Sequence, residues 1–222
     1  HTRPTADQFQ SQRQDLGLEN DDHVVFYCDS EFVGSARAWW MLRLFGHEKV
    51  SVLDGALKSW LARSGASESG PMTDAPKGSF TVRAPVGAQM IPMDSLRQLV
   101  ELGVAGQIAD ARSVGRFAGV DPEPRAGLRG GHMPGASNVP IASLINQDGE
   151  LRSLDEIAAA FAAGGIETDR PVITTCGSGV TACGLALGLA LLGNENVFVY
   201  DGSWSEWGAS DAPIETSTPS PA

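Results

Sequence analysis

Short apolar runs alternate with longer segments of helical character along most of the chain. One run covers residues 171–175 and ends at Cys176, and a stretch of small and apolar residues that suits a helix follows over 182–192. Residues 107–110, Gln-Ile-Ala-Asp, indicate a further strand. Strands that alternate with helices are typical of a parallel sheet with helices on both faces. The pattern therefore predicts an α/β fold.

The apolar pattern occurs twice. Residues 23–28 align with 171–176 at an offset of 148, and residues 50–60 align with 197–207 at an offset of 147. Such an echo at a nearly constant offset indicates that one domain plan is repeated.

Expected helix starts also agree between the two copies. Thr5 with Gln8 and Ser153 with Glu156 both have the spacing of a capping box, in which the two side chains satisfy each other's backbone amides.

These alignments divide the chain into a partial first domain over 1–65, a linker over 66–80, a second domain over 81–215 and a tail over 216–222. The linker is rich in glycine, serine and proline, which marks a boundary. The first copy has no counterpart of residues 91–148. Because an incomplete sheet exposes backbone donors and apolar surface, we predict a first domain that is truncated at its N-terminus and has the missing segment as a partner.

Composition narrows the class of protein. The 222 residues include 16 basic and 27 acidic side chains, a net charge of −11 that disfavours nucleic acid and anionic membranes as partners. Three cysteines suit a reducing compartment, so we expect a cytoplasmic protein, with the mitochondrion as the alternative. The chain shows no paired metal-ligand spacing and no nucleotide-binding fingerprint, so neither a metal nor a cofactor is expected.

The candidate chemistry centres on Cys176, which opens the loop Cys-Gly-Ser-Gly-Val-Thr over 176–181. A loop between a strand and a helix N-terminus offers backbone N–H groups to an anion, and these groups favour a thiolate. Gly177 and Gly179 allow the backbone to approach closely. We interpret Cys176 as a nucleophile; the alternative is a buried cysteine at a strand end.

This loop resembles the active-site loop of the 3-mercaptopyruvate sulfurtransferases, which have the rhodanese fold. Further segments carry the same resemblance over nearly the whole chain: 115–117, 122–125, 131–136 and 201–208 in the second half, and 38–43 and 53–55 in the first. The resemblance implies two rhodanese-like domains with parallel sheets, of which the first is catalytically silent.

The resemblance also implies a reaction. Cys176 would take sulfur from 3-mercaptopyruvate as a persulfide, release pyruvate, and pass the sulfur to a thiol acceptor such as thioredoxin or to cyanide. Arg116 and Arg125 lie nine residues apart on one expected loop, in the positions that the family uses for the substrate carboxylate. The alternative is that these arginines pair with Asp121 or Glu123.

The rest of the loop has implied roles as well. The N–H groups from Gly177 through Val180 to Thr181 are suited to hold the sulfur-bearing anion. In the family, the residue at Ser178 joins a hydrogen-bond relay with a histidine and an aspartate of the first domain. His1 aligns with that histidine, whereas the aspartate lies upstream in relatives.

Other residues of reactive type receive a structural interpretation: Arg112, Arg129, His132, Trp204, Cys28 and Cys183. The alternatives are a wall of the pocket for Trp204, a redox partner of Cys176 for Cys183, and a second reactive site for Cys28.

Three rival functions are weighed against the mercaptopyruvate enzyme. A thiosulfate-dependent rhodanese normally has cationic loop residues, whereas Gly177 and Ser178 are neutral. A cysteine-dependent phosphatase needs Cys-x5-Arg, whereas position 182 is Ala. A non-catalytic rhodanese-like carrier or binding module commonly loses the cysteine, which is present here.

Overall fold

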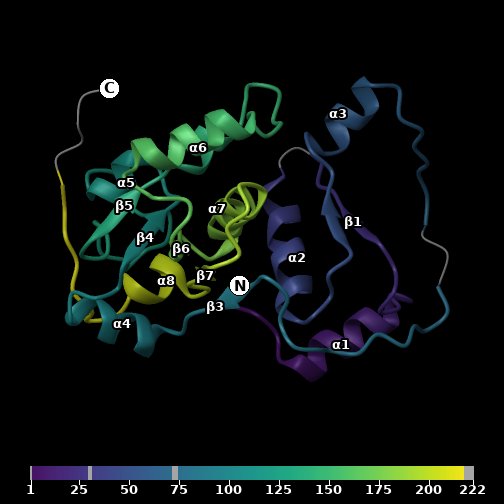
Figure 1. Cartoon of the computed structure of the whole chain (residues 1–222), viewed down its shortest axis with the longest axis horizontal. Coiled ribbons are helices and arrows are strands. Elements are labelled where there is room, and N and C mark those ends of the chain that lie inside the picture. The colour runs from purple at the N-terminus through teal and green to yellow at the C-terminus, as the bar shows by residue number, and fades with distance from the viewer. Residues whose placement is uncertain (1, 30–31, 72–74, 218–222) are drawn as a thin grey trace.

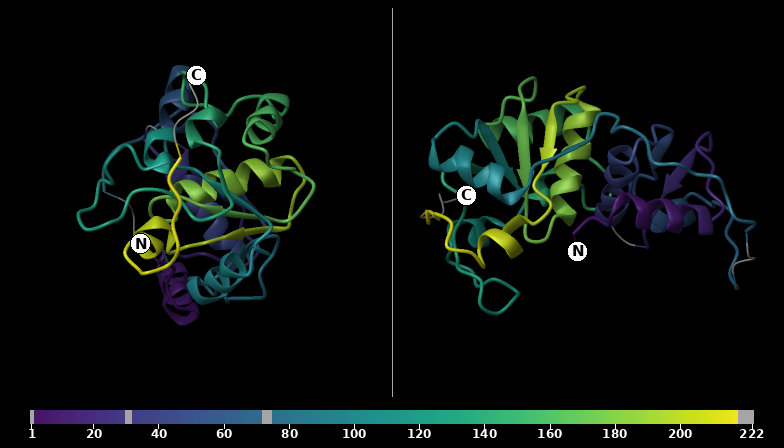
Figure 2. Two further views of the ribbon diagram at one scale, coloured as in Figure 1. Left: turned by 90° about the vertical axis from the view of Figure 1, so that its left-hand side faces the viewer. Right: turned by 90° about the horizontal axis from the view of Figure 1, so that it is seen from below.

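The protein forms two lobes that lie side by side (Figures 1 and 2). A computed structural model describes residues 2–29, 32–71 and 75–217. The first lobe has a two-stranded parallel sheet with three helices, whose bounds are α1 Ala6–Asp15, β1 Val24–Phe26, α2 Val33–Leu44, β2 Val50–Val52 and α3 Ala56–Ala62.

The second lobe is built on a five-stranded parallel sheet with the strand order β3-β7-β6-β4-β5. The strands are β3 Gln89–Met90, β4 Gln107–Asp110, β5 Ala136–Asn138, β6 Val172–Thr175 and β7 Val197–Val199. The helices are α4 Met93–Glu101, α5 Val114–Ala118, α6 Leu154–Ala163, α7 Val180–Leu191 and α8 Ser203–Trp207, with a 3₁₀ turn over Ile141–Leu144.

The predicted α/β fold is confirmed, and its cause is visible in β6. All four residues of this strand are buried, because it lies in the middle of the sheet and helices cover both faces. A parallel strand covered on both sides needs a continuous apolar run rather than an alternating one. The run before Cys176 has that pattern.

The predicted capping boxes are also confirmed. Thr5 accepts a hydrogen bond from the Gln8 amide at the start of α1, and Ser153 accepts one from the Glu156 amide at the start of α6. In both helices the Gln or Glu side chain reaches back to the amide of the capping residue. The matching starts support one plan used twice.

The two copies differ in how their sheets are completed. The pair β1–β2 corresponds to β6–β7, but β6 also pairs with β4, whereas β1 has only β2 as a neighbour among the described strands. Val25 and Tyr27, on and just after β1, are also exposed, Tyr27 at 58 %. The first sheet therefore presents an apolar face to solvent.

The lobes share one hydrophobic core. Helix α2 of the first lobe packs along α7 of the second (Figure 1). Phe32, Ala36 and Trp40 belong to the same buried cluster as Ala182 and Leu185. This contact places one end of α2 next to the loop that precedes α7.

The end of the expected linker packs against the first lobe. Phe80 is fully buried and lies in a cluster with Phe9, Leu42 and Phe45. The expected domain limits at 65, 80 and 215 stay predictions. None of the described helices is long and apolar enough to cross a bilayer.

Candidate active site

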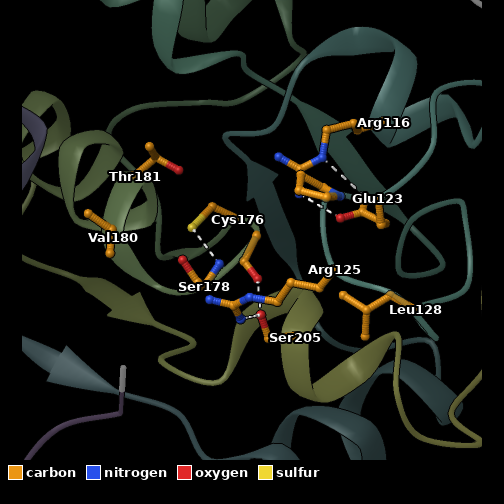
Figure 3. Close-up of a pocket in the computed structure, with 11 residues that line it drawn as sticks. Arg116, Glu123, Arg125, Leu128, Cys176, Ser178, Val180, Thr181 and Ser205 are labelled. Carbon is orange, nitrogen blue, oxygen red and sulfur yellow. Dashed lines mark hydrogen bonds and ion pairs between the residues drawn. The ribbon is translucent and has the colours of Figure 1, made fainter.

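Cys176 lies at the carboxyl end of the central strand β6, at the base of a pocket of about 240 Å³ (Figure 3). Ligands of open parallel sheets bind at this edge, where the strands point their carboxyl ends. The side chain is only 1 % exposed, so the sulfur is reached through the pocket.

Two backbone amides of the loop point at the sulfur. The N–H groups of Gly179 and Ser178 donate to Cys176 Sγ at 3.1 and 3.4 Å. Helix α7 begins directly after them, with Gly179 as its N-cap. Amides and a helix N-terminus together stabilise negative charge on the sulfur.

Gly179 is required by the shape of this loop. Its φ is +80°, and a Cβ at this position would collide with the carbonyl oxygen of Asp201. Gly177 has a different constraint, because its Cβ would lie 2.8 Å from Nη2 of Arg116, the end of a flexible side chain. Close backbone approach is therefore stricter at Gly179.

Arg116 lines the pocket, as expected. The sequence placed it on a loop, and that prediction is wrong. It belongs to the short helix α5, which Ser113 precedes as the N-cap residue. A helix of one turn has no apolar periodicity to detect. Arg116 is paired with Glu123, whose Oε2 lies 2.6 Å from Nη2.

Glu123 links Arg116 to a buried ion pair under the pocket. Arg112 contacts Glu123 at 2.9 Å and Asp110 at 2.7 Å, and its guanidinium lies over the ring of Trp204. All of these Arg112 contacts are internal, which agrees with the structural interpretation of that residue. Glu123 thus connects the pocket wall with the end of β4.

Arg125 approaches the pocket from the loop after α5. Its Nη1 donates to Ser205 Oγ, and Ser205 in turn donates to the carbonyl of Gly177 at 2.6 Å. In Figure 3, Arg116 and Arg125 lie across the pocket from Val180 and Thr181, with Cys176 between the two sides. Among the described residues, Arg125 makes no ion pair.

Most of the other expected site residues also meet here. Gly177, Ser178, Val180 and Thr181 all line the pocket. His1 lies outside the described residues, so the relay between His1 and Ser178 stays a prediction.

The residues with a structural interpretation are described by the structure, and none of them lines the pocket. His132 is buried, with Nδ1 2.8 Å from the carbonyl oxygen of Phe117. Arg129 donates to the carbonyls of Trp207 and Ala212, and the indole N–H of Trp204 donates to the carbonyl of Arg129. These bonds tie loops together.

The remaining two cysteines make contacts that agree with their structural interpretation. Burial raises the pKa of Cys183 to about 12, so its thiol is neutral at physiological pH. Its Sγ donates to the carbonyl of Gly179 at 3.2 Å. Cys28 lies in the other lobe, with its sulfur 3.1 Å from the hydroxyl of Ser35.

Ser203 is a site residue that the sequence interpretation missed. Its hydroxyl accepts from the Cys176 amide at 3.2 Å, donates to the carbonyl of Tyr200 at 2.9 Å, and lies 3.8 Å from Cys176 Sγ. Its φ of +51° is in the left-handed region, which is uncommon for serine. The available signal was its position just after β7, since β7 neighbours β6 and its carboxyl end lies at the same edge.

The geometry combines a nearly buried sulfur, two amides aimed at it and two arginines across the pocket. This arrangement suits a sulfur nucleophile that attacks a small carboxylate-bearing substrate.

Comparisons with known proteins agree with this geometry. The model of the rhodanese-like domain matches residues 1–63 and 93–210. The 3-mercaptopyruvate sulfurtransferase of Escherichia coli strain K12 is 43 % identical over 97 % of this chain and 75 % of its own, and the one of Homo sapiens is 39 % identical over 93 % and 69 %. The crystal structure of SseA from Escherichia coli, described with the rhodanese fold of such enzymes, matches 93 % of this chain and 76 % of that chain with a TM-score of 0.80 and 38 % identity.

Proposed function

The chain belongs to the rhodanese-like family, among its 3-mercaptopyruvate sulfurtransferases, and on that premise we propose that Cys176 carries the transferred sulfur as a persulfide. The observation that carries the proposal is the pair of amides, Ser178 and Gly179, that donate to Cys176 Sγ at the base of the pocket.

The first half-reaction moves one sulfur atom to the enzyme. The Cys176 thiolate attacks the sulfur of 3-mercaptopyruvate, an S–S bond forms, and the C–S bond of the substrate breaks. The electron pair of that bond stays on the carbon fragment as the enolate of pyruvate, which takes up a proton. Cys176 is left as a persulfide, Cys–S–SH.

The two pocket arginines have a separate role, which is to bind the substrate carboxylate. Glu123 already accepts from Nε and Nη2 of Arg116, and Ser205 accepts from Nη1 of Arg125. Each guanidinium has five N–H donors, so donors remain for a bound carboxylate. We infer that both arginines hold the donor with its sulfur toward Cys176.

The second half-reaction returns the thiolate. A thiol acceptor attacks the outer sulfur of the persulfide, forms a new S–S bond and releases Cys176 as a thiolate.

We propose a thioredoxin-like dithiol as the physiological acceptor, which requires a reducing compartment such as the cytoplasm. The test is the rate of sulfur release with reduced thioredoxin against an equal concentration of a small thiol; equal rates per thiol would overturn a protein acceptor.

The test of the main proposal is mass spectrometry after treatment with 3-mercaptopyruvate. We expect an adduct of about 32 Da, one sulfur atom, on the peptide that contains Cys176, and none in Cys176→Ser. Cys183→Ser is the matched control and should still form the adduct. An adduct on Cys183 or Cys28 instead would overturn the assignment.

The donor is tested by steady-state kinetics. We expect kcat/KM for 3-mercaptopyruvate to exceed that for thiosulfate, because Gly177 and Ser178 add no positive charge for a dianion. A preference for thiosulfate would favour the rhodanese alternative.

We also propose that the Ser178 hydroxyl moves a proton together with His1, as the resemblance implies. Both His1→Gln and Ser178→Ala should then lower kcat more than they raise KM. Loss of activity in only one of the two variants would contradict a shared relay.

The exposed apolar face of the first sheet supports a further partner, an N-terminal segment. Val25, Tyr27 and Trp60 line an open apolar hollow there, and such a face normally packs against another element. If a segment covers it in a longer form of the protein, Tyr27→Ser should lower the melting temperature of that form but not of these 222 residues. An equal effect on both would contradict the proposal.

A further inference from the structure

Arg37 belongs to the first lobe but makes polar contacts in the second. It lies on α2, is 8 % exposed, and extends toward the loop that holds Cys176. Its Nη1 donates to the carbonyl of Gly179 at 3.0 Å and lies 2.5 Å from Oδ1 of Asp201. A buried charge of this kind is stable only when it is paired and hydrogen-bonded.

Asp201 is the second member of this contact. It follows β7 directly and is 5 % exposed, and its Oδ2 accepts from the backbone amide of Arg3 at 2.7 Å. The first lobe therefore contributes a hydrogen-bond donor and an ion-pair partner to this carboxylate. Its Oδ1 would lie 3.0 Å from a Cβ on Gly179.

Gly179 connects these groups with the reacting sulfur. Its N–H donates to Cys176 Sγ, its carbonyl accepts from Arg37, and a Cβ on it would collide with the carbonyl oxygen of Asp201. We propose that Arg37 is a positioning residue of the sulfur-accepting loop: it fixes Gly179 so that the amide stays aimed at Cys176, and it neutralises Asp201.

Arg37 stays protonated and positively charged in the folded protein. Burial acts to lower the pKa of Arg37, but the net shift is upward, through Cys183, whose sulfur accepts a hydrogen bond from Arg37, and through the charge of Asp201. Without this cation, a buried carboxylate would stand uncompensated on the far side of Gly179 from the Cys176 thiolate. Like charges at such range disfavour each other's ionised form.

The other charged groups near the loop do not duplicate this role. Arg116 and Arg125 approach from the pocket side, and Glu123 is paired with Arg112 and Arg116. In the described part of the chain, none of these side chains forms a hydrogen bond or an ion pair with Asp201. His1 lies outside the described residues.

This inference rests on the proposed role of Cys176. The experiment compares Arg37→Gln, Arg37→Lys, Asp201→Asn and the double variant R37Q/D201N, each measured for kcat, KM and the rate of Cys176 alkylation by iodoacetamide at pH 7. Far-ultraviolet circular dichroism checks that each variant folds; if Arg37→Gln does not fold, Arg37→Lys and Asp201→Asn carry the comparison.

For Arg37→Gln we expect kcat and the alkylation rate to fall by about tenfold or more. A nearby charge shifts a pKa by about one unit or more, and such a shift lowers the ionised fraction of Cys176. KM should change by less than about threefold, since Arg116 and Arg125 remain. Arg37→Lys should recover part of the loss. R37Q/D201N should alkylate faster than Arg37→Gln, because the uncompensated carboxylate is gone.

Arg43→Gln is the matched control. Arg43 lies on the same helix and also reaches the second lobe, 3.7 Å from Glu195, but it has no contact with the loop. We expect its kinetics to match the unsubstituted protein. Unchanged kinetics in Arg37→Gln, or a double variant as slow as Arg37→Gln, would overturn the inference, whereas no persulfide on the unsubstituted protein would overturn the proposed function instead.

Discussion

Gly179 serves two neighbours at once, since its amide faces Cys176 and its carbonyl faces Arg37. We expect Gly179→Ala to lose most sulfurtransferase activity. Holding alanine in the left-handed region costs about 1–2 kcal/mol, and relief of the collision with Asp201 must move the loop. Kinetics and urea unfolding measure the two effects.

Gly165→Ala is the control for this prediction. Gly165 has a φ of +73°, and nothing lies within 4 Å of its Cβ position. The Gly165→Ala variant should lose about 1 kcal/mol of unfolding free energy, because alanine is held in the left-handed region, and it should keep its activity. Equal kinetics in the two variants would show that the Gly179 loop tolerates a side chain.

The two pocket arginines should respond differently to substitution. Arg125 has no ion pair among the described residues, so Arg125→Ala should leave the melting temperature unchanged. It should raise KM by about tenfold, which corresponds to the loss of roughly 1.5 kcal/mol of charged hydrogen bonding to the substrate.

Arg116→Ala should raise KM and also lower the melting temperature, because it removes one of the two cations paired with the buried Glu123. A stable Arg116→Ala would mean that Arg112 alone satisfies Glu123.

Single residues also mark where sequence reasoning ends. The loop around Cys176 was predictable because strand, glycine and helix follow one another along the chain. Ser203 was not, since its hydrogen bond to Cys176 depends on β6 and β7 being neighbours. Arg37 was not, because its partner Asp201 is distant in sequence and belongs to the other copy.

At the scale of elements, the capping box of α6 contributes a stability that depends on pH. The Ser153 side chain, followed by its backbone amide, lowers the pKa of Glu156 in the folded protein. A lowered folded pKa stabilises the protein above the unfolded value of about 4.3 and loses that stabilisation as the pH falls through the folded value.

Ser153→Ala should therefore lower the melting temperature at pH 7, because it removes the cap of α6, and the difference from the unsubstituted protein should shrink below about pH 4. Melting temperatures between pH 3 and 7 measure this. Thr5→Ala, at the other box, should show no comparable acid dependence, because its partner is the neutral Gln8.

Elements with strong local signals were predictable, namely the buried strands and the capped helices. Helix α5 was missed because five residues carry neither a period nor a capping hydrogen bond. The resulting error placed Arg116 on a loop, although it left the residue in the pocket.

At the scale of the molecule, the shared core predicts that the lobes lose stability together. Trp40 is buried in the cluster that joins α2 to α7, so Trp40→Ala should cost about 3–5 kcal/mol and lower the unfolding midpoint of both lobes. Trp60, which is 43 % exposed, is the control and should cost far less. The loss of activity with increasing urea concentration measures unfolding of the second lobe, and hydrogen exchange of the α2 amides measures unfolding of the first.

The repeated plan was visible in the sequence because its segments keep a nearly constant offset. The packing of one copy on the other was not, since helices α2 and α7 meet through side chains that are equally plausible in any core. Only their assembly brings Gly179 between a cation of one lobe and a sulfur of the other.

The ion-pair chain beneath the pocket has a consequence for selectivity. Asp110 and Glu123 balance Arg112 and Arg116, two negative charges against two positive ones, so among the described arginines of the site Arg125 is the one without a carboxylate partner. A guest with a single negative charge can pair with Arg125, whereas a second negative charge on the guest would have no cation to meet and would face the Cys176 thiolate. We therefore expect the wall of this pocket to favour donors with one negative charge over those with two, before any sulfur is exchanged.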